Sequence, residues 1–77
     1  MNQFYVIEIQ TNVDGTSGNF VWGFANRNEA EAKFHSTAAY AAQSTVLVHS
    51  VVMLTKEGNL LKNDYYIHPA EPEPAEE

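Results

Sequence analysis

One apolar run decides the fold of this chain, Thr45-Val46-Leu47-Val48-His49-Ser50-Val51-Val52-Met53-Leu54. Successive side chains of an extended strand point to opposite faces. The run therefore sets Val46, Val48, Val52 and Leu54 on one face and Leu47, Val51 and Met53 on the other. A small antiparallel sheet with one solvated face alternates apolar with polar residues instead. We expect the second face of this strand to meet another copy of the protein, a partner or a ligand.

Three further strands and one helix are predicted around this run. The predicted elements are strands over 4–11, 20–25 and 60–68, a hairpin loop over 12–19, a helix from a cap at Asn26 or at Asn28 to about Ser44, and a Gly-centred turn over 56–59. The first strand alternates aromatic and β-branched residues, and the loop concentrates residues that tolerate turn conformations. The chain therefore reads as ββαββ.

The order of these elements predicts an α+β fold with a four-stranded antiparallel sheet. A right-handed crossover through the helix sets the third strand beside the first, which gives the order 2-1-3-4. The helix stripe around Phe34 should pack on the face that carries Phe20, Trp22 and Phe24. The other face should stay bare and serve as an oligomer or partner interface, with the predicted members Phe4, Val6, Leu47, His49, Val51, Met53 and Tyr66.

The length of the chain makes oligomerisation attractive. A domain of 77 residues buries only about 60% of the surface that its unfolded form exposes, so its core is marginal. The chain has no Cys, and its sequence shows no metal-ligand pattern, so neither disulfides nor zinc is expected to reinforce it. We predict one domain over 1–68 and a disordered acidic tail of Pro and Glu over 69–77.

The acidic balance comes largely from that tail. Of the ten acidic residues, four lie after position 68, and the remaining six face four basic residues, which leaves the folded body at about minus two. Scattered bases in such a body do not form the basic stripe that nucleic-acid binding requires. No segment has the pattern of a signal peptide or a membrane span. We therefore expect a soluble cytoplasmic protein that binds neither nucleic acid nor membrane.

The sequence contains no recognisable catalytic or metal-binding motif. Its three imidazoles, His35, His49 and His68, lack the spacing that builds a metal site on one helix or strand. The segment 14–18 contains glycines but lacks the Gly-Lys-Ser/Thr ending of a phosphate loop, and no Ser lies in a Gly-x-Ser-x-Gly elbow. We expect no cofactor, no metal and no enzymatic activity. An inter-subunit active site using His35 or His49 is the alternative.

His49 interrupts the apolar run on the face predicted to be bare, and Glu8 shares that face. One hypothesis is a Glu8–His49 pair, within or between subunits, that makes association sensitive to pH. The plainer interpretation is a partly exposed His at the edge of an apolar patch. Both interpretations remain open at the level of sequence.

Several side chains have the chemistry of a nucleotide site. Arg27, His35, Tyr40 and Tyr65 are of types that bind anions or stack on bases, and they could clasp a nucleotide-like ligand between subunits. The alternative is that the tyrosines lie at the margins of a small core.

The overall pattern resembles a known group of proteins. The segments Phe4–Gln10, Phe20–Phe24, Glu29–His35 and His49–Leu54, with Glu57-Gly58 after them, resemble short uncharacterised proteins encoded on phages and mobile elements of Gram-positive gut bacteria. The resemblance implies stoichiometric binding, including antagonism of host defence, and it assigns no role to any residue.

These observations favour a non-enzymatic, oligomeric binding protein that sequesters a host protein or a nucleotide-like signal in the host cytoplasm. The alternative function is a structural or accessory subunit of a phage or mobile-element assembly. Discrete oligomers would favour the first hypothesis, and open-ended assembly would favour the second.

Overall fold

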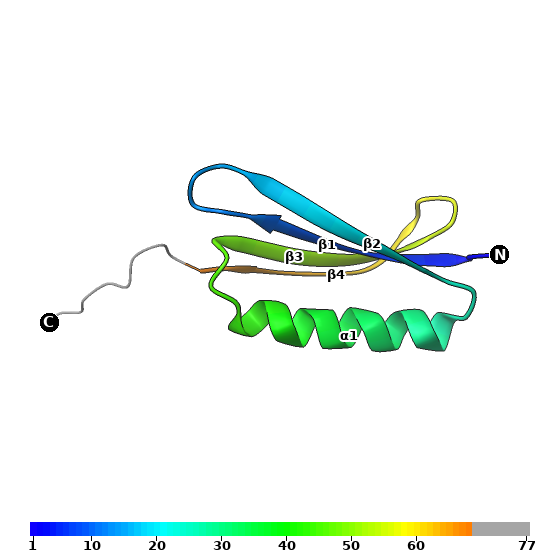
Figure 1. Cartoon of the computed structure of the whole chain (residues 1–77). Helices are drawn as coiled ribbons and strands as arrows, with labels where there is room; N and C mark the ends of the chain where they lie inside the picture. Colours follow the sequence, from blue (N-terminus) through cyan, green and yellow to red (C-terminus); the bar gives the residue numbers. More distant parts are fainter. Residues whose placement is uncertain (69–77) are drawn as a thin grey trace, which may run out of the picture.

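The computed structural model describes residues 1–68 and has an α+β fold. Its elements are β1 (Phe4–Thr11), β2 (Ser17–Phe24), α1 (Arg27–Gln43), β3 (Val48–Thr55) and β4 (Leu60–Ile67). The strands form one antiparallel sheet in the order β2-β1-β3-β4, as predicted. The helix runs along one face of this sheet (Figure 1). The predicted acidic tail over 69–77 lies outside the described residues.

Helix α1 begins and ends where local chemistry dictates. The side chain of Asn26 accepts a hydrogen bond from the backbone N–H of Glu29, so Asn26 is the predicted N-cap. At the other end the N–H of Ser44 donates to the carbonyl of Ala41. The buried stripe consists of Ala30, Phe34, Thr37, Ala38 and Ala41. Because most of these side chains are small, the helix lies close to the sheet.

The core between helix and sheet is small. Its buried apolar members are Val6, Ala30, Phe34, Ala38, Val51 and Met53, with Phe4, Trp22, Phe24 and Leu61 half-buried at its margin. Only four side chains are both large and fully buried, and His49 is one of them. Among the described residues, no helix is both long and apolar enough to cross a membrane.

The prediction of which sheet face stays bare was wrong. Val6, His49, Val51 and Met53 are fully buried on the face that α1 covers. Phe4 packs at the margin of that core, and Tyr66, which pairs with His49, is half-buried on the same face. Leu47 precedes β3 and is half-buried. These seven residues therefore do not form an uncovered surface.

Strand register explains the error. Val6 pairs with both Trp22 and Met53, so β1 turns its even-numbered residues toward the helix together with the aromatic side of β2. The prediction had set Phe4 and Val6 of this row on the bare face instead. Because the side-chain period of a strand is two, a shift of one residue moves a whole row to the opposite face.

Within residues 1–68, no element covers the opposite side of the sheet (Figure 1). We call this surface the open face, and the pairing register gives its apolar members as Tyr5, Ile7, Ile9, Val21, Val48, Val52, Leu54, Leu60, Tyr65 and Ile67. Ile67, Tyr65, Leu60 and Val21 are each 57–63% exposed. The predicted uncovered apolar face therefore exists, but on the other side of the sheet.

The two hairpin turns lie at opposite ends of the sheet (Figure 1). The first loop is shorter than predicted, because β2 begins at Ser17 and the N–H of Asn12 donates to the carbonyl of Thr16 over 2.8 Å. Gly15 has a φ of 91° and Gly58 a φ of 93°, in the left-handed region that favours glycine. Asp14 accepts hydrogen bonds from the backbone N–H and the hydroxyl of Thr16.

The corrected face assignment predicts that Val51→Lys prevents folding. Val51 is fully buried beneath α1, so the substitution places an unpaired ammonium in the core and should cost about 3 kcal/mol or more. Urea unfolding followed by far-UV circular dichroism measures this loss. Ala39→Lys, on the exposed side of the same helix, is the control and should stay within about 0.5 kcal/mol of the parent. A folded Val51→Lys chain would contradict the assignment.

The first hairpin should be sensitive to acid through Asp14. The hydrogen bond from the Thr16 backbone N–H, and then that from its hydroxyl, lower the pKa of Asp14 below its usual value of 3.8. A lowered pKa in the folded state means that this stabilisation is present above the unfolded value and disappears as the pH falls through the folded value. Asp14→Ala should therefore lower the melting temperature at pH 7, and the difference should vanish in strong acid. Asp14→Asn, which keeps an acceptor oxygen without the charge, should show a smaller loss without that pH dependence.

Candidate functional site

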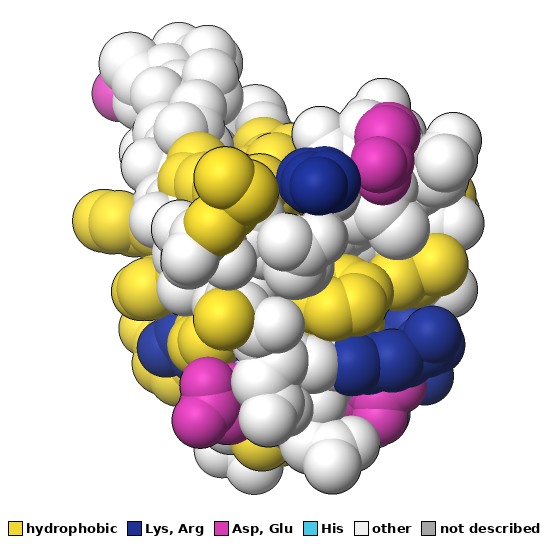
Figure 2. All heavy atoms as spheres, turned by 90° about the vertical axis from the view of Figure 1, so that its right-hand side faces the viewer, with side chains coloured by type: hydrophobic (Ala, Val, Ile, Leu, Met, Phe, Trp, Pro, Cys, Tyr) yellow, Lys and Arg dark blue, Asp and Glu magenta, His cyan; other side chains and the backbone are white. Residues whose placement is uncertain are grey.

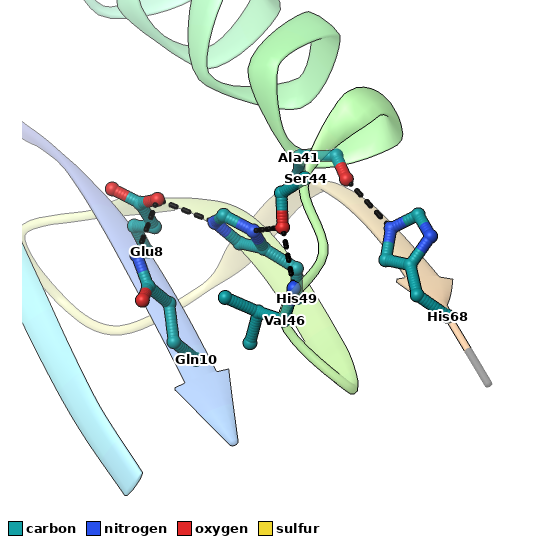
Figure 3. Close-up of polar contacts among 7 residues, drawn as sticks. All are labelled: Glu8, Gln10, Ala41, Ser44, Val46, His49 and His68. Atoms are coloured by element: carbon teal, nitrogen blue, oxygen red, sulfur yellow. Dashed lines mark hydrogen bonds and ion pairs between the residues drawn. The ribbon is translucent and has the colours of Figure 1, made fainter. Parts of the chain in front are cut away.

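A buried polar cluster connects the sheet to the end of the helix (Figure 3). Nε2 of His49 contacts Oε2 of Glu8 in the neighbouring strand, and Nδ1 of His49 lies 2.8 Å from Oγ of Ser44. Gln10 donates from Nε2 to the same Glu8 oxygen over 3.1 Å. The strand register brings Glu8 and Gln10 to His49, because Gln10 pairs with His49 and Glu8 lies two residues away on the same face.

The hydrogen-bond inventory assigns the protons in this cluster. A carboxylate only accepts, so Nε2 of His49 donates to Glu8. Oγ of Ser44 accepts from the N–H of Val46 over 3.0 Å and, because a hydroxyl both donates and accepts, it can pair with Nδ1 of His49 in either direction. The cluster thus satisfies both ring nitrogens of a fully buried His. The hypothesis of a Glu8–His49 pair, within or between subunits, is confirmed as a contact within one chain, its effect on association at different pH stays a prediction, and the interpretation of His49 as partly exposed is wrong.

The order Ser44, His49, Glu8 has the same groups as a hydrolytic triad, but its surroundings favour a structural role. His49 is completely buried, which leaves a substrate no access to its ring. Ser44 caps the C-terminus of α1. The carbonyl dipoles at that helix end disfavour the negative oxygen that forms during acyl transfer. The cluster therefore acts as a polar connection between β1, β3 and the helix.

A second contact holds β4 to the same helix end. Nε2 of His68 donates to the carbonyl of Ala41 over 2.9 Å, and the backbone N–H of His68 donates to the carbonyl of Leu47. Within the described part of the chain, no group of three or more His, Cys, Asp or Glu side chains is arranged to hold a metal ion.

The four residues predicted to bind a nucleotide do not come together. Arg27 pairs with Glu31 on the helix surface over 3.0 Å, and this hydrogen bond lowers the pKa of Glu31. His35 is exposed beside the ring of Phe34. Tyr65 lies on the open face, on the other side of the sheet from the helix. Only Tyr40 lines a pocket.

That pocket lies between the sheet and the helix and has a volume of about 150 Å³. It is lined by Glu8, Trp22, Lys33, Ser36, Thr37 and Tyr40. Nζ of Lys33 lies 4.0 Å from the centre of the Trp22 ring, so a cation from the chain itself already occupies this aromatic face. Ligand pockets for drug-sized molecules are usually about 300–1,000 Å³. The pocket is too small to enclose a nucleotide.

The open face has the chemistry of a protein contact. By register, all the charged residues of the described strands, Glu8, Lys62 and Asp64, lie on the helix side. The open face therefore combines exposed apolar side chains with uncharged polar ones such as Ser50 and Asn63. On the end of the molecule seen in Figure 2, by contrast, side chains of both charges lie among the hydrophobic ones. Sequence reasoning found the feature but assigned the wrong residues to it.

Comparison with known protein families, curated proteins and solved structures found no match to this chain.

The polar cluster predicts a strong coupling between Glu8 and His49. Replacing either one alone by Leu removes the Glu8–His49 contact, leaves the buried partner with only its hydrogen bond to Gln10 or Ser44, and should cost about 3–5 kcal/mol. Replacing both should cost clearly less than the sum of the two single losses. A double-mutant cycle by urea unfolding measures the coupling, and additive losses would show that the contact contributes nothing.

Proposed function

We propose that this chain is a non-enzymatic binding protein that works as a small homo-oligomer and sequesters a host protein. The observation that carries the proposal is the open face, which is apolar, uncharged and uncovered within residues 1–68. An exposed apolar surface of this kind marks a protein interaction site on soluble domains. Its chemistry suits another protein surface.

Two further observations favour protein contact over the other functions. The pocket of about 150 Å³ is too small to enclose a nucleotide, which weakens the proposal of a nucleotide-like signal. In the Ser44–His49–Glu8 cluster the His49 ring is fully buried and Ser44 lies at a helix C-terminus, which weakens the proposal of an active site.

The resemblance to short phage and mobile-element proteins supplies the biological setting of the proposal. Proteins of that kind often act by stoichiometric binding inside the host cell. We therefore place the action of this chain in the host cytoplasm, as an antagonist of a host defence factor.

A structural or accessory subunit of a phage or mobile-element assembly is the second candidate. Edge strand β2 favours it, because its eight residues carry no charge and no Pro, and its register with β1 has no interruption. Natural sheets usually block such an edge. The other edge strand, β4, has a register shift against β3 and carries Lys62 and Asp64. An unblocked edge suits open-ended growth of a sheet.

A capture experiment tests the binding proposal. The tagged chain should retain one host protein from lysate in high salt, because the small charge of the folded body leaves little for salt to screen. The retained protein, once purified, should bind the chain directly with a fixed stoichiometry. Failure to bind in the purified system would contradict the proposal.

A thermal-shift screen with cyclic and linear nucleotides tests the alternative that the chain sequesters a nucleotide-like signal. We expect no change in the melting temperature. A ligand at about 100 times its dissociation constant would add about 2.7 kcal/mol and would be detected. A clear stabilisation would replace the protein target by a small-molecule one.

A further inference from the structure

We infer that the open face is closed by a second copy of this chain, giving a two-fold dimer in which two sheets pack face to face with the helices outside. The inference rests on the proposed function, because it names the first partner of the surface proposed there. It also gives the oligomer a number and an arrangement.

The area of the open face reaches the minimum for a specific interface between two copies. Four strands spaced by about 4.8 Å span roughly 19 Å, and eight residues at about 3.3 Å each span roughly 26 Å. One face is thus about 500 Å² in projection, and two such faces in contact bury about 1,000 Å² before side-chain relief is counted. A specific interface needs about 1,000 Å² or more in total.

The charge distribution fits a second copy. Two chains that each carry a net negative charge repel one another unless their charges stay apart. The charged strand residues Glu8, Lys62 and Asp64 lie on the helix side, away from the proposed contact. Joining two open faces therefore buries no charged residue of the described strands and needs no complementary charge on the partner.

The small core favours a partner that is present from the moment of folding. Among residues 1–68 of a single copy, the largest fully buried side chains are Met53, His49, Val6 and Val51, and His49 is polar. Central open-face residues such as Ile7 and Val52 are already half-buried by their neighbours, so a second sheet packed over them would complete their burial. Obligate dimer interfaces resemble a protein core cut in half. Further copies of the chain are present wherever the protein is made, whereas a host target need not be present when the chain folds.

The symmetry of such a contact limits assembly through the open face to two copies. Face-to-face packing uses the same surface on both chains, so the dimer has no equivalent open face left for a third. Aligned sheets pack about 10 Å apart with interdigitating side chains, as in β-sandwiches. Because the dimer covers both open faces, a host target then binds the surfaces that stay exposed, which are the outer sides of both helices and the unblocked β2 edges.

The wild-type chain gives the first test. Sedimentation equilibrium should return twice the single-chain mass of 8.6 kDa, unchanged over a wide range of concentration. The melting temperature should rise with protein concentration, because association stabilises only the folded chain. A single-chain mass, or a mass that keeps growing with concentration, would overturn the inference.

Charge substitution at the centre of the open face gives the second test. A centred two-fold axis brings Val52 of one copy near Val52 of its partner. Val52→Lys and Val52→Glu should each weaken the dimer by roughly a hundredfold, because like charges then meet at the centre of the contact. An equimolar mixture of the two variants should recover dimer relative to either alone. Ala39→Lys, on the exposed side of α1, is the control and should remain dimeric.

The outcomes separate this inference from the proposed function. Far-UV circular dichroism reports whether each variant folds. If the Val52 variants do not fold, the mass of the wild-type chain decides whether the protein is a dimer. A wild-type chain that is monomeric yet binds a purified host protein overturns the dimer, and with it the oligomeric part of the proposed function, but leaves the sequestration of a host protein standing. A wild-type dimer that binds no host protein overturns the proposed function alone. Val52 variants that fold and stay dimeric would show that the contact uses another surface.

Discussion

The rest of the structure depends on how one short helix packs on a sheet that is apolar on both sides. Helix α1 approaches closely because its buried stripe is mostly alanine, with Phe34 as its one large side chain. Close packing seals Val51 and Met53 on one face. The chain has no second helix among its described residues, so the opposite face stays uncovered. Architecture and proposed function therefore follow from the same shortage of covering elements.

The buried Glu8–His49 pair adds specificity to this small core. Two polar side chains beneath a helix cost free energy unless they satisfy each other. Here the strand register brings them together, and Ser44 occupies the remaining ring nitrogen. A one-residue slip of either strand would move one member to the open face and leave the other unpaired in the core. The pair thus acts as a check on register, and its burial fits a structural role better than a catalytic one.

Residue patterns predicted some parts of the chain well because those parts depend on local chemistry. The Asn26 cap and the helix stripe around Phe34 follow from hydrogen bonding and the helical period within a single segment. The strand order 2-1-3-4 follows from the short connections and the handed crossover. The nucleotide-site hypothesis failed for the opposite reason. Arg27 and Tyr65 suit such a ligand by type, but nothing in the sequence fixes their separation in space.

The sequence by itself determined that the sheet has two apolar faces, that one helix is available to cover them, and that the strands carry few charges. Only the tertiary structure decided which face the helix covers. The run of β3 is apolar on both sides, so its own pattern cannot distinguish inward from outward. The choice is made by cross-strand pairing, which joins Val6 to Met53 and brings Glu8 to His49 across 41 residues of chain. Pairing between distant segments carries no local signature, and a single step in it exchanges the two faces.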